Sequence, residues 1–204
     1  MKTVIECGAN RGTDTDKLLE MFPGQDTTVY AIEPTYELVS THLYPKFKDD
    51  PRVKICQWAV DIENTFKTFN VASVMKGAAD WGCSSLHEFT DNIHELWPDR
   101  PDFQVTHKYT VPTMTLWDFC NLYRITSIDY LWIDTQGNDY NVLQSLKEKI
   151  SIVKEGRCEV ANLVELYKNT GNTRNNVEEF LVNNGFEIET IGSSYEADIK
   201  FKRK

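Results

Sequence analysis

The sequence predicts a doubly wound, Rossmann-like α/β domain, in which helices cover both faces of a mostly parallel seven-stranded sheet with an antiparallel C-terminal strand. Two observations support this prediction. Short apolar runs alternate with segments of helical period along most of the 204 residues. A turn that carries two glycines lies between the first apolar run and the first helical segment. The length and the 41% hydrophobic content suit a single domain over residues 1–204.

The predicted strands are short apolar runs, and the predicted helices between them each carry one apolar stripe. The last two strands lie close enough in the sequence to form an antiparallel pair. The strands are residues 3–7, 28–33, 53–58, 128–134, 157–164, 186–191 and 197–201. The stripes are Leu18, Leu19 and Phe22; Tyr36, Val39, Leu43 and Phe47; Leu116, Phe119, Cys120 and Tyr123; Val142, Leu143, Leu146 and Ile150; and Val177, Phe180 and Leu181.

Residues 75–102 interrupt this pattern and are predicted to be an irregular insertion or lid. An alternating segment at 63–70 predicts an extra strand or hairpin arm before it, and a further strand is predicted at 109–111. Aromatic and polar residues mix in the insertion, which is therefore a candidate acceptor-binding region; alternatively, its tryptophans pack onto the core. The candidate acceptor-binding residues are Trp81, Ser84, Ser85 and His87.

The charge and the cysteines narrow the classes of partner. The chain has 22 Lys and Arg against 31 Asp and Glu, a net charge of −9, which argues against nucleic acid and membrane surfaces as partners. The five scattered cysteines contain no C-x-x-C pair and predict neither a disulfide framework nor a zinc site. No apolar run approaches the roughly 20 residues that span a bilayer. We therefore expect a cytoplasmic protein.

The turn at residues 6–12 is the first candidate binding element. Gly8 and Gly12 follow a buried strand, where a missing Cβ lets a ligand approach the backbone, and the helix that follows offers unpaired N–H groups. Glu33 ends the second strand 21 residues after Gly12, where a carboxylate can accept both hydroxyls of an adenosine ribose. The structural alternative is a tight turn and a solvated strand end.

The same turn discriminates between nucleoside cofactors. A dinucleotide site favours G-x-G-x-x-G, whereas this turn has G-x-x-x-G with Asn10 and Arg11 inside it. The carboxylate of Glu6 would repel a pyrophosphate and suits the cationic methionine end of S-adenosylmethionine. This reasoning favours S-adenosylmethionine as the cofactor. A nucleotide (NAD)-dependent oxidoreductase is the alternative enzyme class.

At these residues the chain resembles the FkbM-type S-adenosylmethionine-dependent methyltransferases, many of which methylate hydroxyls of sugars and natural products. The resemblance implies a cofactor site formed by the first turn, the end of the second strand and a residue beside the adenine. It rests on residues 5–12, 29–34, 58–60, 82–86, 111–116, 128–139, 159–167, 180–181 and 184–186. The implied cofactor residues are Glu6, Gly8, Ala9, Asn10, Arg11, Gly12, Glu33, Pro34 and Ala59, together with Asp134.

Two departures from the family pattern leave the general base open. The family usually has Lys-x-Asp-x-Glu-Gly at the end of the fourth strand, and here Trp132 and Gln136 replace the Lys and the Glu. Asp134 remains and is the best-placed candidate for the general base, a hydroxyl acceptor or a metal ligand. Its structural alternative is a helix cap, a role that Asn138 or Asp139 fills more naturally.

Two further residues are catalytic candidates. Glu159, near the end of the fifth strand, is a second acid that with Asp134 can bind Mg²⁺ or Mn²⁺. His87 is a candidate base near neutral pH, or a surface histidine. Together these features predict an S-adenosylmethionine-dependent O-methyltransferase that acts on a sugar or glycan hydroxyl. The alternatives are the NAD-dependent oxidoreductase and a non-catalytic cofactor-binding domain.

Overall fold

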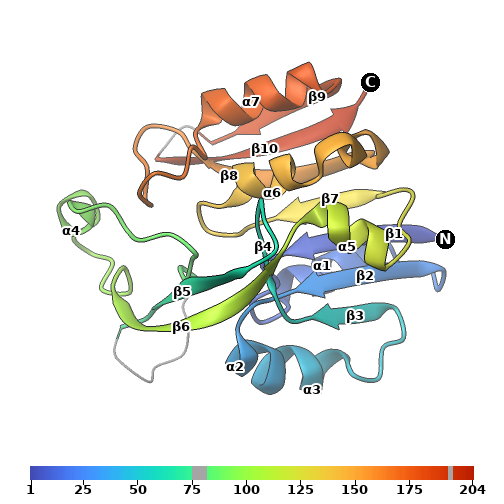
Figure 1. Ribbon diagram of the computed structural model, residues 1–204, viewed down its shortest axis with the longest axis horizontal. Helices are drawn as coiled ribbons and strands as arrows, with labels where there is room; N and C mark the ends of the chain where they lie inside the picture. Colours follow the sequence, from blue (N-terminus) through green and yellow to red (C-terminus); the bar gives the residue numbers. More distant parts are fainter. Residues whose placement is uncertain (75–81, 193–194) are drawn as a thin grey trace.

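The computed structural model describes residues 1–74, 82–192 and 195–204 and contains a seven-stranded sheet (Figure 1). Five strands run parallel, and the last strand of the chain runs antiparallel to both of its neighbours, as the sequence predicts. In sheet order the strands are β3 (Val53–Cys56), β2 (Thr27–Ile32), β1 (Lys2–Cys7), β7 (Tyr130–Ile133), β8 (Glu155–Ala161), β10 (Glu196–Arg203) and β9 (Phe186–Ile191).

Helices cover both faces of this sheet because the side chains of each central strand are buried on both sides. On one face, Leu18, Leu43 and Phe47 pack on the first two strands. On the other, Phe119 and Leu143 belong to the largest core cluster. The first face carries α1 (Thr13–Met21), α2 (Tyr36–Leu38), η1 (Val39–Leu43) and α3 (Tyr44–Phe47). The second carries α5 (Leu116–Leu122), α6 (Asp139–Ser145), η2 (Lys147–Ile152) and α7 (Arg174–Asn183).

Two predicted helices change their winding. In the segment after β2, η1 is a π-helical turn, with the Tyr44 N–H donating to the Val39 carbonyl five residues back. Pro45 follows and has no N–H to continue the regular α-helical bonds. The predicted helix through Ile150 is divided at Lys147, whose φ of 51° ends α6 and begins the 3₁₀ helix η2. Among the described residues, no helix is both long and apolar enough to cross a bilayer.

A smaller sheet stands beside the carboxyl ends of the main strands and extends away from them (Figure 1). Its order is β4 (Ala59–Val60), β6 (Val105–Met114) and β5 (Phe66–Ala72), and the antiparallel β5–β6 pair is the hairpin arm predicted from the alternating segment at 63–70. The hairpin is longer than predicted, since β6 begins before residue 109. The chain between its strands includes α4 (Ile93–Leu96).

The described part of the predicted insertion at 75–102 has an apolar cluster of its own. Cys83 and Ile93 are buried there together with Phe103, directly after the insertion, and with Leu166 and Tyr167 from the chain that follows β8. This cluster joins the insertion to the main domain, so its described residues are packed and not merely irregular. Trp97 packs against the cluster, in agreement with the packing alternative, whereas Trp81 lies outside the described residues.

Candidate functional site

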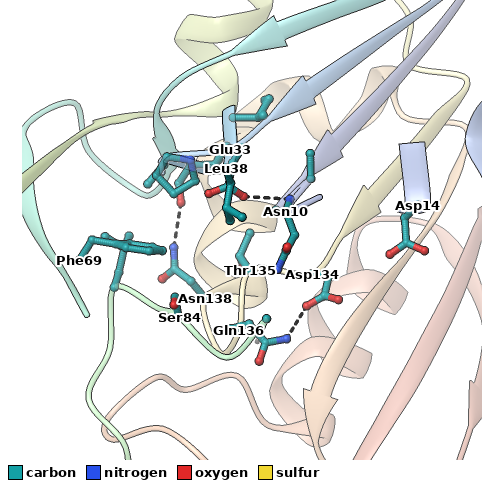
Figure 2. A pocket seen from close by; sticks show the side chains of 18 of the residues that line it. Asn10, Asp14, Glu33, Leu38, Phe69, Ser84, Asp134, Thr135, Gln136 and Asn138 are labelled. Carbon is teal, nitrogen blue, oxygen red and sulfur yellow. Dashed lines mark hydrogen bonds between the residues drawn. The ribbon is translucent and has the colours of Figure 1, made fainter. Parts of the chain in front are cut away.

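A cavity of about 590 Å³ opens at the carboxyl ends of β1, β2 and β7 (Figure 2). Its wall comes from the turns after these strands, from β4 and β5, and from the start of the described insertion. This volume lies within the range of small-molecule sites, and the edge of the sheet is where open α/β folds bind ligands. The cavity therefore brings together the segments that the sequence singled out.

Gly8 and Gly12 in the first turn allow neighbouring parts of the chain to pack closely against the turn. Gly8 lines the cavity at φ 91°, and a Cβ there would overlap the backbone carbonyl oxygen of Asp134. Gly12 lies outside the cavity wall at φ 73°, and its Cβ would overlap the ring of Phe47. Gly8 thus allows the ends of β1 and β7 to meet, and Gly12 allows α3 to pack on the start of α1. The structure gives Gly12 this packing role, and its predicted role in the cofactor site stays a prediction.

The wall between the two glycines is formed by Ala9, Asn10 and Arg11. Asn10 has a φ of 47°, a left-handed conformation that asparagine tolerates. Arg11 is exposed and is the only Lys or Arg among the described residues that line the cavity. The turn therefore offers backbone, an amide and one cation to a ligand.

Glu33 is held as the sequence predicts for a binding carboxylate. It lines the cavity and is 4% exposed, and its Oε2 accepts from the Asn10 N–H at 2.9 Å (Figure 2). Its Oε1 accepts from the Thr35 N–H, also at 2.9 Å. The two bonds fix the carboxylate between the turn after β1 and the start of α2. A carboxylate oxygen can accept more than one hydrogen bond, so Glu33 in this position can also accept from a ligand hydroxyl. Pro34 also lines the cavity.

Glu6 does not line the cavity, in contrast to the position implied by the resemblance. Its side chain is wholly buried on the face of β1 that α1 covers, and its Oε2 accepts from the Thr15 hydroxyl at 2.5 Å. Its Oε1 has no hydrogen-bond partner among the described residues. Burial raises the pKa of Glu6 to about 8, and the nearby acids Asp14, Glu33 and Asp134 raise it further against the Thr15 bond. The carboxyl is therefore mainly neutral at pH 7.

The loop after β7 carries Asp134 and Gln136 into the cavity wall. The Gln136 Nε2 donates to Asp134 Oδ1 at 2.6 Å (Figure 2). Burial raises the pKa of Asp134, and this hydrogen bond opposes the rise. Trp132, the other departure from the family pattern, lies away from the cavity, where the Arg157 guanidinium stacks on its ring at 4.2 Å.

Asp139 braces the loop, a role that its position in the sequence does not reveal. The side chain is wholly buried and accepts from the Thr135 N–H and hydroxyl and, through its other oxygen, from the Glu159 N–H at 2.8 Å. Burial raises the pKa of Asp139 to about 7. It therefore joins the loop after β7 to β8 at the first residue of α6. The Asn138 side chain makes no capping bond to that helix.

Three of the predicted acceptor-binding residues in the insertion, Ser84, Ser85 and His87, are described by the structure. One lines the cavity, and the other two support the loop after β7. Ser84 lines the cavity, and its Oγ accepts from the Ala72 N–H at 2.9 Å. Ser85 is buried, and its hydroxyl donates to the Gln136 carbonyl at 2.6 Å. The His87 Nε2 lies 2.8 Å from Asn138 Oδ1. Neither Ser85 nor His87 is part of the wall, so both support the loop after β7 from behind. Trp81 lies outside the described residues.

Glu159 lies at the end of β8, outside the cavity wall. Burial raises its pKa to about 9, and the neighbouring acids, first Asp134, raise it further. Within the part of the chain that the structure describes, no three or more His, Cys, Asp or Glu side chains are grouped to hold a metal ion. A Mg²⁺ or Mn²⁺ ion on Asp134 and Glu159 remains a prediction from the sequence.

The opposite end of the cavity is apolar. Ala59 is part of it, as the resemblance implies for a residue beside an adenine, with Phe69, Leu38 and Leu86 nearby in the wall. The Asn138 Nδ2 donates to the Val60 carbonyl at 2.8 Å and holds β4 against the loop after β7. No motif in the sequence marks Phe69, Leu38 or Leu86 as wall residues, although the alternating pattern of 63–70 predicts the strand that carries Phe69.

These features fit S-adenosylmethionine. The apolar end suits the adenine, Glu33 suits the ribose hydroxyls, and the acids Asp14 and Asp134 suit a sulfonium and an ammonium group. Arg11 suits the carboxylate of the methionine end. With three acids and one base in the wall, the described cavity is a poor match for a pyrophosphate.

Comparisons with known proteins agree with this fit. No curated protein matches the chain. A solved structure of methyltransferase FkbM from Methylobacillus flagellatus is similar, with a TM-score of 0.61 and 11% identity, over 98% of this chain and 43% of that one. A precorrin-6y C5,15-methyltransferase from Geobacter metallireducens has a TM-score of 0.50 and 10% identity, over 100% of this chain and 80% of that one.

At these identities the solved structures show the fold alone, and the chain spans less than half the length of the Methylobacillus protein. The family model described as the methyltransferase FkbM domain matches residues 6–188, which is most of the sequence. The match favours the methyltransferase interpretation over the NAD-dependent oxidoreductase. The chain therefore belongs to the FkbM methyltransferase family and has the fold of S-adenosylmethionine-dependent methyltransferases.

Proposed function

We propose that this protein methylates a hydroxyl group of a sugar or glycan, with S-adenosylmethionine as the methyl donor. The observation that carries the proposal is the carboxyl group of Asp134, which lies in the wall of the cavity at the end opposite the apolar one and is held there by Gln136. A partly buried carboxyl group in the wall of a cavity is placed to accept a proton from a bound hydroxyl, and burial raises the pKa of Asp134 from its ordinary value.

Bound S-adenosylmethionine supplies an electrophilic methyl group on a sulfonium and leaves as S-adenosylhomocysteine. The cofactor would give this methyl group to the acceptor oxygen, and Asp134 would take the proton of the acceptor hydroxyl. Glu33, Arg11 and the apolar wall around Ala59 hold and orient the cofactor.

The polar side chains near Asp134 support a hydroxylated acceptor. Asn10, Ser84 and Gln136 line the same part of the cavity and can donate to or accept from several hydroxyls of one sugar (Figure 2). The net charge of −9 favours such a neutral acceptor over nucleic acid or an anionic membrane surface. The five cysteines are buried and form no disulfide with one another, which supports action in a reducing compartment such as the cytoplasm.

The test begins with isothermal titration of S-adenosylmethionine and S-adenosylhomocysteine, with and without Mg²⁺ or Mn²⁺. We expect both ligands to bind and Glu33→Ala to lose at least ~10-fold in affinity, since it removes the carboxylate that faces the ribose. Glu37→Ala, at an exposed position of α2, is the matched control and should bind as the wild type does. Binding of NAD(H) in place of these ligands would refute the proposal.

Acceptors are then screened with mono- and oligosaccharides by the release of S-adenosylhomocysteine. Asp134→Asn keeps the shape of the side chain but cannot accept the proton, so turnover should fall by ~10²-fold or more while the cofactor still binds. Cofactor binding with no methylated hydroxyl would support the non-catalytic alternative. A dependence of turnover on Mg²⁺ or Mn²⁺ that Glu159→Gln abolishes would support the predicted metal site.

A further inference from the structure

The side chain of Gln136 connects two groups that lie on opposite sides of it. Its Nε2 donates to Asp134 Oδ1 at 2.6 Å, and its Oε1 accepts from the hydroxyl of Tyr167 at 2.9 Å. Tyr167 comes from the chain after β8, so the connection joins two segments that are distant in the sequence. The amide is therefore held at both ends.

Tyr167 and Asp134 together favour one orientation of the amide. The Tyr167 hydroxyl lies 2.9 Å from two carbonyl oxygens, Gln136 Oε1 and that of the Cys83 backbone, and has one proton to donate to them. The NH₂ group of Gln136 faces the Asp134 carboxylate and its oxygen faces the Tyr167 hydroxyl, so each end of the amide meets a group of suitable polarity. The reverse orientation would place an amide oxygen against Asp134 Oδ1, which is electrostatically unfavourable.

The ring of Tyr167 is itself fixed. It is 4% exposed and stacks on Phe89, with the ring centroids 5.2 Å apart. It also lies against Gly137, where a Cβ would come within 2.6 Å of the ring. A hydroxyl on so immobile a ring is a precise anchor, because little side-chain entropy remains to be lost.

The backbone of Gln136 is also constrained. Its φ of 54° is in the left-handed region, which costs free energy for a residue with a side chain. The Ser85 hydroxyl donates to its carbonyl at 2.6 Å and holds this conformation. The insertion and the chain after β8 thus converge on one glutamine beside Asp134.

We propose that Gln136 and Tyr167 are positioning residues that hold Oδ1 of Asp134 and direct its Oδ2 to the hydroxyl of the acceptor. The proposal rests on the function proposed above. Oδ1 is occupied by the Gln136 N–H, whereas Oδ2 accepts no hydrogen bond from the described residues. The acceptor proton therefore goes to Oδ2. A carboxylate without this anchor rotates about its Cβ–Cγ bond and loses the alignment that in-line transfer needs.

The same hydrogen bond acts on the charge of Asp134. Burial favours the neutral acid, and the Gln136 N–H favours the carboxylate, which is the form that accepts a proton. Removing the N–H donor should therefore raise the pKa of Asp134. This consequence can be measured without knowing the acceptor.

The test follows the carboxyl carbon of Asp134 by NMR in protein labelled with ¹³C-aspartate, and Asp134→Asn assigns the signal. In Gln136→Met the midpoint of the titration should rise by about one pH unit, the worth of a hydrogen bond to a charged group. Tyr167→Phe keeps the ring and should give a smaller rise, because the amide loses its anchor but not its N–H. Tyr140→Phe, on α6 against Phe180, is the matched control and should leave the midpoint unchanged.

Turnover supplies the second measurement once an acceptor is found. Tyr167→Phe should lower kcat by ~10-fold or more with little change in the KM for the cofactor, because the alignment of the base is lost and not the binding of the cofactor. An unchanged midpoint and kcat in this variant would overturn the positioning role, even where Gln136→Met fails to fold. Full turnover of Asp134→Asn would instead refute Asp134 as the base, whatever the NMR titration shows.

Discussion

The buried carboxyl of Glu6 makes the stability of the protein depend on pH in an unusual direction. Its pKa is about 8 in the folded protein and 4.5 as an ordinary glutamate. Glu6→Gln replaces it with a neutral side chain of the same shape. The amide oxygen of the glutamine can still accept from the Thr15 hydroxyl, as Glu6 Oε2 does.

The sign follows from proton binding. Between pH 4.5 and 8 the folded protein keeps a proton on Glu6 that the unfolded chain has released, so the free energy of unfolding falls as the pH rises. The stability that protonated Glu6 contributes is fully present below pH 4.5, its pKa in the unfolded chain. It is lost as the pH rises to about 8, its pKa in the folded protein. Three and a half pH units at 1.36 kcal/mol each give roughly 5 kcal/mol as an upper value.

The assay is urea unfolding of wild type and Glu6→Gln at pH 5, 6, 7 and 8. We expect the two proteins to have similar free energies of unfolding near pH 5. For each pH unit above 5, the free energy of unfolding of the variant should rise by about 1 kcal/mol relative to that of the wild type. Glu20→Gln, at an exposed position of α1, is the matched control and should stay within about 0.5 kcal/mol of the wild type at every pH.

A difference between Glu6→Gln and wild type that does not change with pH would refute the reasoning, because Glu6 would then ionise as it does in the unfolded chain. If the wild type instead becomes more stable relative to the variant as the pH rises, a positive group must stabilise the carboxylate of Glu6. Either result would also indicate that Glu6 is an ionised acid in the turn at residues 6–12, as the sequence predicts.

Three further substitutions test the turn after β1 and the carboxylate of Glu33. Gly8→Ala should cost more than about 3 kcal/mol in urea unfolding or abolish folding, because its Cβ would overlap the backbone carbonyl of Asp134 at a φ of 91°. Gly12→Ala should lower the free energy of unfolding by about 1–3 kcal/mol, since Phe47 can move slightly but the φ of 73° remains strained. A loss below about 0.5 kcal/mol in the same measurement would contradict the packing role of Gly12. Glu33→Gln should weaken S-adenosylhomocysteine binding ~10-fold in calorimetry, because its NH₂ group would face a backbone N–H, and unchanged affinity would remove Glu33 from the cofactor site.

The parallel strands and the main binding edge could be predicted from the sequence because their signals are local. The apolar runs of β1 and β7 identify buried strands, and parallel strands end at one edge of a sheet. The turn at residues 6–12 and Glu33 were therefore predicted to lie at one edge, and the structure has Gly8 and Glu33 in one cavity wall, with Gly12 outside it. The extra hairpin was also visible, since its alternating residues follow the period of a strand.

The direction of individual side chains could not be predicted in the same way. A parallel strand that is buried on both faces has no polar side to mark which residues meet a helix. Glu6 was therefore assigned to the cavity, although its side chain lies under α1. The braces Ser85, His87 and Asp139 depend on contacts between distant segments, and no local pattern encodes them.

The position of β10 has a consequence for how the chain folds. This strand is the last in the sequence, yet it lies between β8 and β9 and pairs with both. During synthesis, β9 therefore has no neighbour in the sheet until β10 has been synthesised, whereas β1, β2 and β3 can already pair. Such late, non-local pairing slows folding and leaves a strand edge exposed to other chains. The half of the sheet that contains β8 and β9 should therefore be the half most dependent on chaperones in the nascent protein.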